Sequence, residues 1–156
     1  MKTYTARGIR ALYLGLLALL LLAAPALTAE YNSGVTAKVL KKTSVTGNNE
    51  KITYPVTDKA EVTAMTVDLA PGAETGWHKH PAPVYAYVVA GELSVELEDG
   101  SRLSFASGDA IIEVVNTWHN GKNSGQAPVQ LAVFYLGVEG TANVIKPGPT
   151  DILPRK

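Results

Sequence analysis

The sequence has no cysteine, and only three of its 156 residues are histidine, His78, His80 and His119. The lack of cysteine excludes disulfides, thiolate metal ligands and thiol nucleophiles. Any metal ion must therefore be held by histidine, aspartate or glutamate. The sequence also lacks a basic block or an arginine-rich run. Nucleic-acid binding therefore has no electrostatic support, and we expect no nucleic-acid partner.

The first 29 residues follow the three-part pattern of a secretory signal peptide. Three basic residues precede residues 11–24, which form an uncharged apolar run, and small residues follow. The run is shorter than the roughly 20 apolar residues that span a bilayer, which favours a cleaved peptide over an uncleaved anchor. We expect cleavage after Thr28 or Ala29, a periplasmic or secreted protein, and no membrane partner after cleavage.

The charge of the mature chain is slightly negative. The first 29 residues hold 3 of the 14 Lys+Arg and none of the 14 Asp+Glu, so 11 basic residues remain against 14 acidic ones, a net charge of −3. The remaining residues are enough for one hydrophobic core without covalent cross-links.

The pattern after the leader predicts an all-β domain, because short runs rich in Val, Thr, Ile and Tyr alternate with turn residues. The expected strands are residues 35–40, 51–56, 60–70, 84–90, 92–99, 102–107, 110–115 and 129–138. Residues 116–125 are expected to be a loop. Many short strands with close turns imply a sandwich or barrel, and a closed jelly roll would leave a central cavity.

This pattern divides the chain into four parts. We expect a signal peptide at 1–29, N-terminal strands or an arm at 30–60, a barrel core at 61–138 and a proline-rich tail at 139–156. The tail should be irregular, and it packs either on the barrel or on a second subunit.

Two of the histidines stand one residue apart. In a strand, residues i and i+2 point to the same face, so His78 and His80 would offer two imidazoles side by side, with Lys79 facing away. His119 follows another apolar strand. The alternatives are two solvated strand histidines or, with His119, a metal site.

Fixed spacings surround these histidines. Gly72 precedes the His-x-His pair by five residues; Val84 follows the pair after three residues, and Gly91 after six more. In the second half, Gly108 is followed by five residues and Val114-Val115-Asn116, and then by His119 and Asn123 at spacings of two and three residues.

With these spacings, residues 62–135 resemble the cupin superfamily. The resemblance implies a double-stranded β-helix, or jelly-roll barrel. It also implies that His78, His80 and His119 occupy three histidine ligand positions for one divalent ion: Fe, Mn, Zn, Ni or Cu. The usual Pro-x-Gly of the second motif is replaced, and Asn116 stands where the glycine would be. Asparagine tolerates the left-handed backbone that such a glycine would adopt, so the turn can survive.

The family's usual glutamate ligand is also replaced, because Val84 stands at that position. A subgroup of small bacterial cupins, which this sequence resembles in its His-x-His-Pro run, often has Glu just before the second motif's Pro. Glu113 stands there. A carboxylate in so apolar a strand must face solvent or find a partner. Glu113 is therefore expected to be a metal ligand, a catalytic acid or base, or an exposed residue.

Other candidates have more ordinary interpretations. Glu74 shares strand parity with the His-x-His pair, but a residue so close to a turn is often simply exposed. Trp77 and Trp118 directly precede histidines and should face outward, where packing is favoured over substrate stacking. Tyr85 and Tyr87 share an outward parity, consistent with a homodimer.

These observations favour an exported, metal-dependent enzyme that acts on a small, oxygen-chelating molecule, in the manner of a dioxygenase or of an isomerase or lyase. The alternative is a module that binds a small ligand or a metal without turnover, because the same fold supports both.

Overall fold

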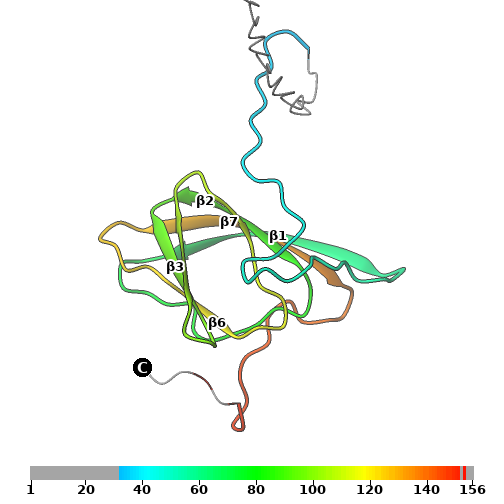
Figure 1. Ribbon diagram of the computed structural model, residues 1–156, viewed down its shortest axis with the longest axis vertical. Helices are drawn as coiled ribbons and strands as arrows, with labels where there is room; N and C mark the ends of the chain where they lie inside the picture. Colours follow the sequence, from blue (N-terminus) through cyan, green and yellow to red (C-terminus); the bar gives the residue numbers. More distant parts are fainter. Residues whose placement is uncertain (1–31, 152, 154–156) are drawn as a thin grey trace, which may run out of the picture. The chain divides into compact units, whose positions relative to one another are not determined.

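The computed structural model of the protein describes residues 32–151 and 153 (Figure 1). The expected signal peptide lies outside these residues. The chain divides into two units, Met1–Ala37 and Lys38–Lys156, and the second contains all the strands described below. In the described part no helix has the length and apolar character needed to cross a membrane.

The barrel is built from two antiparallel sheets, and the labelled strands of both surround a common interior in Figure 1. The strands are β1 (Ala60–Leu69), β2 (Val84–Ala90), β3 (Glu92–Leu97), β4 (Arg102–Ala106), β5 (Ala110–Ile112), β6 (His119–Lys122) and β7 (Val129–Val138). One sheet has the order β1-β7-β2-β5, and the other has the order β4-β3-β6. This all-β jelly roll confirms the expected fold class.

The core lies between the sheets and follows the period of two residues expected for strands. In β7, Val129, Leu131, Val133 and Tyr135 are buried and alternate with more exposed residues. The neighbouring positions Val84, Ala86 and Val88 of β2, in the same sheet, are at most 5 % exposed, and Leu93 of β3, in the other sheet, belongs to the same buried cluster. Burying one such Val or Leu side chain contributes about 1.5–3 kcal/mol, so this alternation holds the two sheets together.

Two turns depend on particular residues. Gly91, between β2 and β3, has φ 81°, and a Cβ there would lie 2.6 Å from the Pro128 carbonyl oxygen. A side chain would therefore be both strained and obstructed. Asn116 has φ 55°, the left-handed backbone expected at the position of the missing glycine. Its N–H donates to the His80 carbonyl oxygen at 2.8 Å, which ties the two histidine motifs together.

The N-terminal expectations need correction. Residues 35–40 and 51–56 are not strands; the described residues before β1 contain one isolated pairing, between Val45 and Lys51. Val39 and Leu40 are 66 % and 50 % exposed, so their apolar side chains gain little from an extended pairing. Pro55 has no N–H to donate to a neighbouring strand. Residues 38–59 are therefore an arm rather than strands.

Two further boundaries differ from the expectation. Residues 116–125, expected to be a loop, contain β6, which pairs with β3 between Leu97–His119 and Ser94–Lys122. The strand expected at 110–115 ends at Ile112, so Glu113 lies just beyond β5 rather than within it.

The start of the tail packs on the barrel of the same chain. Lys79 and Ile145 form an antiparallel pair in which each N–H donates to the other's carbonyl oxygen, at 3.0 and 2.9 Å. The Asn143 side chain donates to the Thr63 hydroxyl of β1 at 3.0 Å. Residues 143–146 therefore lie beside the His-x-His segment.

Candidate metal centre

The three histidines converge inside the barrel. His78 and His119 face each other in an isolated antiparallel pair whose two N–H···O bonds are 3.0 and 2.9 Å. The centroids of the three rings lie 4.3–5.0 Å apart, and each residue offers one ligand atom within 4.8 Å of the other two. All three residues are buried, with His80 only 1 % exposed. The expected juxtaposition of the two motifs is therefore present.

Each ring is oriented by a backbone carbonyl oxygen that faces its Nδ1. The pairs are His78–Gly76 at 2.7 Å, His80–Asn143 at 2.8 Å and His119–Thr117 at 2.9 Å. Because a carbonyl oxygen only accepts, Nδ1 must donate, and Nε2 of each neutral ring carries the lone pair. Metal-ligating histidines are commonly fixed by hydrogen bonds of this kind.

Glu113 completes the cluster. One carboxylate oxygen, Oε2, lies 3.2 Å from Nε2 of both His80 and His119. Burial raises the pKa of the Glu113 carboxyl, whereas His119 and His80 lower it when their Nε2 atoms carry protons and donate to the carboxylate. Glu113 is therefore an inward-facing carboxylate. This position does not match an exposed strand residue, but it matches a metal ligand or a catalytic acid or base.

The donor set fits a cation. The lone pairs of His80 and His119 face the Glu113 carboxyl group, and Nε2 of His119 is buried without a hydrogen-bond partner. A proton shared with Glu113 would satisfy one ring, whereas a divalent ion would satisfy all the facing atoms at once. Burial, followed by the neighbouring His119, lowers the pKa of His78 to about 4. Its imidazole thus stays neutral near pH 7, as a metal ligand must.

These side chains lie on the wall of a cavity of about 290 Å³. Much of the wall is apolar, formed by Val67 of β1, Leu93 and Val95 of β3, and Leu131 and Val133 of β7. The polar lining residues besides the cluster are Thr75, Tyr135 and Lys146. The site therefore combines a compact polar end with room for a small, partly apolar molecule.

Tyr135, Asn143 and Lys146 were not singled out from the sequence. Tyr135 follows the same parity as Leu131 and Val133, so alternation in β7 could have found it; its ring packs edge-on against His80 at 5.5 Å. Burial and then the Glu113 charge raise the Tyr135 pKa, so its hydroxyl stays protonated. Asn143 and Lys146 lie in the irregular tail, where no periodic pattern indicates their position.

Glu74, the second acidic candidate, lies outside the cluster. Its Oε1 is 3.1 Å from Lys122 Nζ, and its Oε2 accepts a hydrogen bond from Asn120 at 3.0 Å. It pairs with side chains of β6, where His119 and Asn120 point to different partners.

Trp118 and Asn123 lie outside the imidazole cluster and have structural contacts. Trp118 is 8 % exposed, and Lys79 Nζ lies 4.4 Å from its ring centroid, consistent with packing rather than substrate stacking. Asn123 is fully buried and donates to the Leu69 and Ala127 carbonyl oxygens, so its amide ties the loop after β6 to the end of β1.

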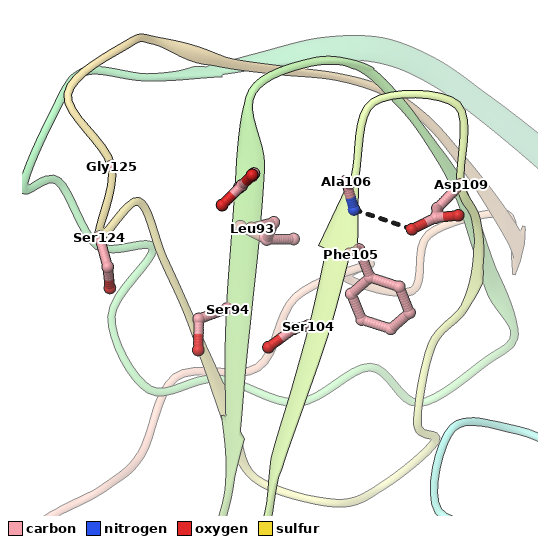
Figure 2. A pocket seen from close by; sticks show the side chains of 9 residues that line it. Leu93, Ser94, Ser104, Phe105, Ala106, Asp109, Ser124 and Gly125 are labelled. Atoms are coloured by element: carbon pink, nitrogen blue, oxygen red, sulfur yellow. Dashed lines mark hydrogen bonds between the residues drawn. The ribbon is translucent and has the colours of Figure 1, made fainter.

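A second hollow, of about 450 Å³, lies on β3, β4 and the loops beside them. Figure 2 shows Ser94 and Ser104 on these neighbouring strands, and the Ala106 N–H donating to Asp109 Oδ2 at 2.8 Å. No histidine lines this hollow, and Asp109 is occupied in shaping its turn. The imidazole cluster is therefore the stronger candidate for a functional site.

Comparison with known proteins agrees with this architecture. The sequence profile of the family described as "Cupin domain" matches residues 65–135. These residues therefore resemble a cupin domain. The match contains all three histidines and Glu113, whereas Lys146 lies beyond it. No curated protein matches the sequence significantly.

Solved structures share the cupin fold with this chain. The DMSP lyase DddQ from Ruegeria pomeroyi DSS-3 is 22 % identical with a TM-score of 0.50, and the match covers 62 % of this chain and 47 % of that one. A structure reported with the DMSP lyases RdDddP and RnDddQII is 20 % identical with a TM-score of 0.48. That match covers 56 % of this chain and 44 % of the other. The chain thus spans less than half the length of these two proteins, and its likeness to the first concerns the fold alone.

Proposed function

We propose that His78, His80, His119 and Glu113 hold one divalent ion, and that the protein is a metal-dependent enzyme for a small molecule bound through oxygen. The observation that carries this proposal is the orientation of the rings. Each Nδ1 is engaged by a backbone carbonyl, which leaves the three Nε2 lone pairs free, and those of His80 and His119 face the Glu113 carboxylate on the wall of a cavity.

Such an ion supplies Lewis acidity toward a carbonyl or enol oxygen and, if it is redox-active, electrons for reaction with dioxygen. The residues of the chain supply orientation and proton transfer. Where Glu113 does not bind the ion, its carboxylate can accept a proton, whereas Tyr135, whose pKa is raised by burial and by the Glu113 charge, stays protonated and can donate a hydrogen bond. The apolar walls exclude water from the ligand. This division of roles is compatible with a dioxygenase and with an isomerase or lyase.

A module that binds without turnover is the second candidate. The observation that favours it is the position of Glu113 Oε2, 3.2 Å from two ring nitrogens. If the carboxylate is committed to a metal ion, it is not free to act as the general base, and the cavity then holds fewer groups for acid–base chemistry.

The test begins with the metal content of the untagged protein. We expect about one divalent ion per chain in the wild type and none in His119→Ala, measured by elemental analysis. Oxygen uptake and product analysis with a panel of enols, phenols and hydroxy acids would then separate the two candidates. Turnover that disappears in His119→Ala supports the enzyme; tight ligand binding without turnover across the panel supports the module. A wild-type protein that binds no divalent ion contradicts both.

We also propose that the protein is exported to the periplasm or the medium. The support is the basic start and apolar run of residues 1–29. Mass spectrometry of the protein from cell fractions should find a chain that begins at Ala29 or Glu30 outside the cytoplasm. A full-length cytoplasmic chain would contradict export.

A further inference from the structure

Lys146 is held at the cavity by the docked start of the tail. Ile145, its neighbour, pairs with Lys79, and Asn143 accepts the hydrogen bond of His80 Nδ1. Lys146 Nζ donates to the Thr75 carbonyl oxygen at 3.1 Å and lies 3.8 Å from the position of a Cβ on Gly76. Because the Gly76 carbonyl orients His78, the ammonium group lies next to the backbone that supports the imidazole cluster.

The ammonium group has no carboxylate partner in the described part of the chain. The ion pairs found there involve other residues, and the contact with Thr75 uses one of its three donors. Lys122 is a useful contrast, because its Nζ is 3.1 Å from Glu74 Oε1. Lys146 therefore keeps donors and a positive charge available at the edge of the cavity.

The cavity that Lys146 and the imidazoles both line is otherwise mainly apolar. Val67, Leu131 and Val133 form part of its wall, and Val144 of the tail also lines it. Of the lining residues, Lys146 and Glu113 carry permanent charge, and Glu113 faces the histidines. The wall of the cavity thus combines a cationic side chain, an apolar surface and the proposed metal-binding cluster.

We propose that Lys146 binds an anionic group of the ligand, so that the cavity takes a small organic acid whose second, oxygen-bearing group faces the histidine cluster. This inference rests on the proposed function, because that second group is recognised by the metal ion. A carboxylate at Lys146 Nζ would form a charge-assisted hydrogen bond, which is stronger than one between neutral groups. The apolar part of the wall accommodates the carbon frame of the ligand.

The experiment compares two probes that differ in charge and little in shape, 3,4-dihydroxybenzoate and 3,4-dihydroxybenzamide. Both present the same pair of chelating hydroxyl groups, and only the first is an anion near pH 7. Their binding to the untagged, zinc-loaded protein is measured by isothermal titration calorimetry in low salt. Zinc content is determined first for each protein, so that a failure of the metal site, and hence of the proposed function, is seen separately from a failure at Lys146.

The expected result is that the wild type binds the acid about tenfold more tightly than the amide, a ratio typical of one charge-assisted hydrogen bond. Lys146→Gln should retain zinc and bind both probes about equally, whereas Lys146→Arg should keep most of the preference. Lys122→Gln is the matched control and should behave as the wild type, because Lys122 is paired with Glu74.

Three outcomes would overturn the assignment in a protein that holds zinc. The first is wild-type binding without preference for the acid, or no binding of either probe. The second is a preference that survives in Lys146→Gln. The third is an equal loss of preference in Lys122→Gln, which would indicate the general field of the protein rather than contact with Lys146.

Discussion

Glu113 and Glu74 occupy two contrasting regions of the same barrel. Glu74 is surrounded by donors, with Lys122 on one carboxylate oxygen and Asn120 on the other. Glu113 instead faces the ring nitrogens of His80 and His119, whose protons are directed away toward backbone carbonyls. A carboxylate among donors is already satisfied, whereas one among lone pairs needs a cation. This difference separates a structural ion pair from a candidate metal ligand.

The two regions meet in β6, where successive side chains point in different directions. His119 contacts Glu113, and Asn120, the next residue, donates to Glu74. Two adjacent positions therefore serve different functions, and each substitution in one region has a natural control in the other.

The largest difference in zinc affinity is expected between the variants His119→Ala and Asn120→Ala. Loss of His119 removes one of three imidazoles, and we expect the affinity for zinc to fall by more than about 100-fold, since even partners of the ligands typically affect it 10–100-fold. Asn120→Ala should leave zinc affinity within a few-fold. Competition with a chromophoric chelator measures both. Equal losses in the two variants would mean that the substitutions act through folding.

A smaller difference in zinc affinity is expected between Glu113→Gln and Glu74→Gln. Glu113→Gln removes the anion that faces the ring nitrogens, and we expect zinc affinity to fall by about 10–100-fold. Glu74→Gln should change it by less than about twofold, because Glu74 lies outside the imidazole cluster. The same chelator competition gives both values. If Glu113→Gln keeps full zinc affinity, Glu113 is not a ligand and its role as an acid or base becomes the better explanation.

The next largest effect on zinc affinity is expected from Asn143, whose carbonyl oxygen orients the His80 ring. Asn143→Ala removes the 3.0 Å hydrogen bond to Thr63, which helps hold the Asn143 carbonyl against His80. We expect a loss of about 1 kcal/mol in the free energy of unfolding and a decrease of a few-fold in zinc affinity. Urea unfolding of the metal-free protein and a zinc titration check the two parts. Unchanged zinc affinity would show that the tail backbone holds His80 without the Thr63 contact.

The smallest effect is expected from loss of the ion pair between Lys122 and Glu74. Lys122 is 48 % exposed in its side chain, and exposed ion pairs contribute roughly 0–1 kcal/mol. Lys122→Gln should therefore reduce the free energy of unfolding by less than about 1 kcal/mol, and less at high salt, without changing zinc affinity. Urea titrations at two ionic strengths provide the measurement. A loss of zinc binding would contradict the separation of the two regions.

Local pattern predicts part of the fold well. The bounds of β7 are those expected from the sequence, because its side chains alternate between core and exterior over ten residues. By contrast, β6 has the sequence His-Asn-Gly-Lys, which resembles a loop. It is a strand because β3 supplies its hydrogen bonds, and that pairing is tertiary. Residues 35–40 show the reverse case, since their composition suits a strand but the described structure provides no partner.

The site was predictable to a similar extent. Motif spacing and the family resemblance predicted that the three histidines lie together and that Glu113 is a candidate ligand. Strand parity predicted that Glu74 and the His-x-His pair share a face, but it did not indicate their partners. Lys146 and Asn143 contact residues more than 60 positions away in sequence. Their roles depend on where an irregular tail docks, and local periodicity contains no information about such a contact.

The most direct test of the metal centre is X-ray absorption at the zinc edge of the untagged, zinc-loaded protein, together with its zinc content. We expect one ion per chain, coordinated by three imidazoles at about 2.0–2.1 Å and by oxygen. An ion bound in less than stoichiometric amounts, or a coordination shell of oxygen with one imidazole or none, would contradict the proposed metal centre.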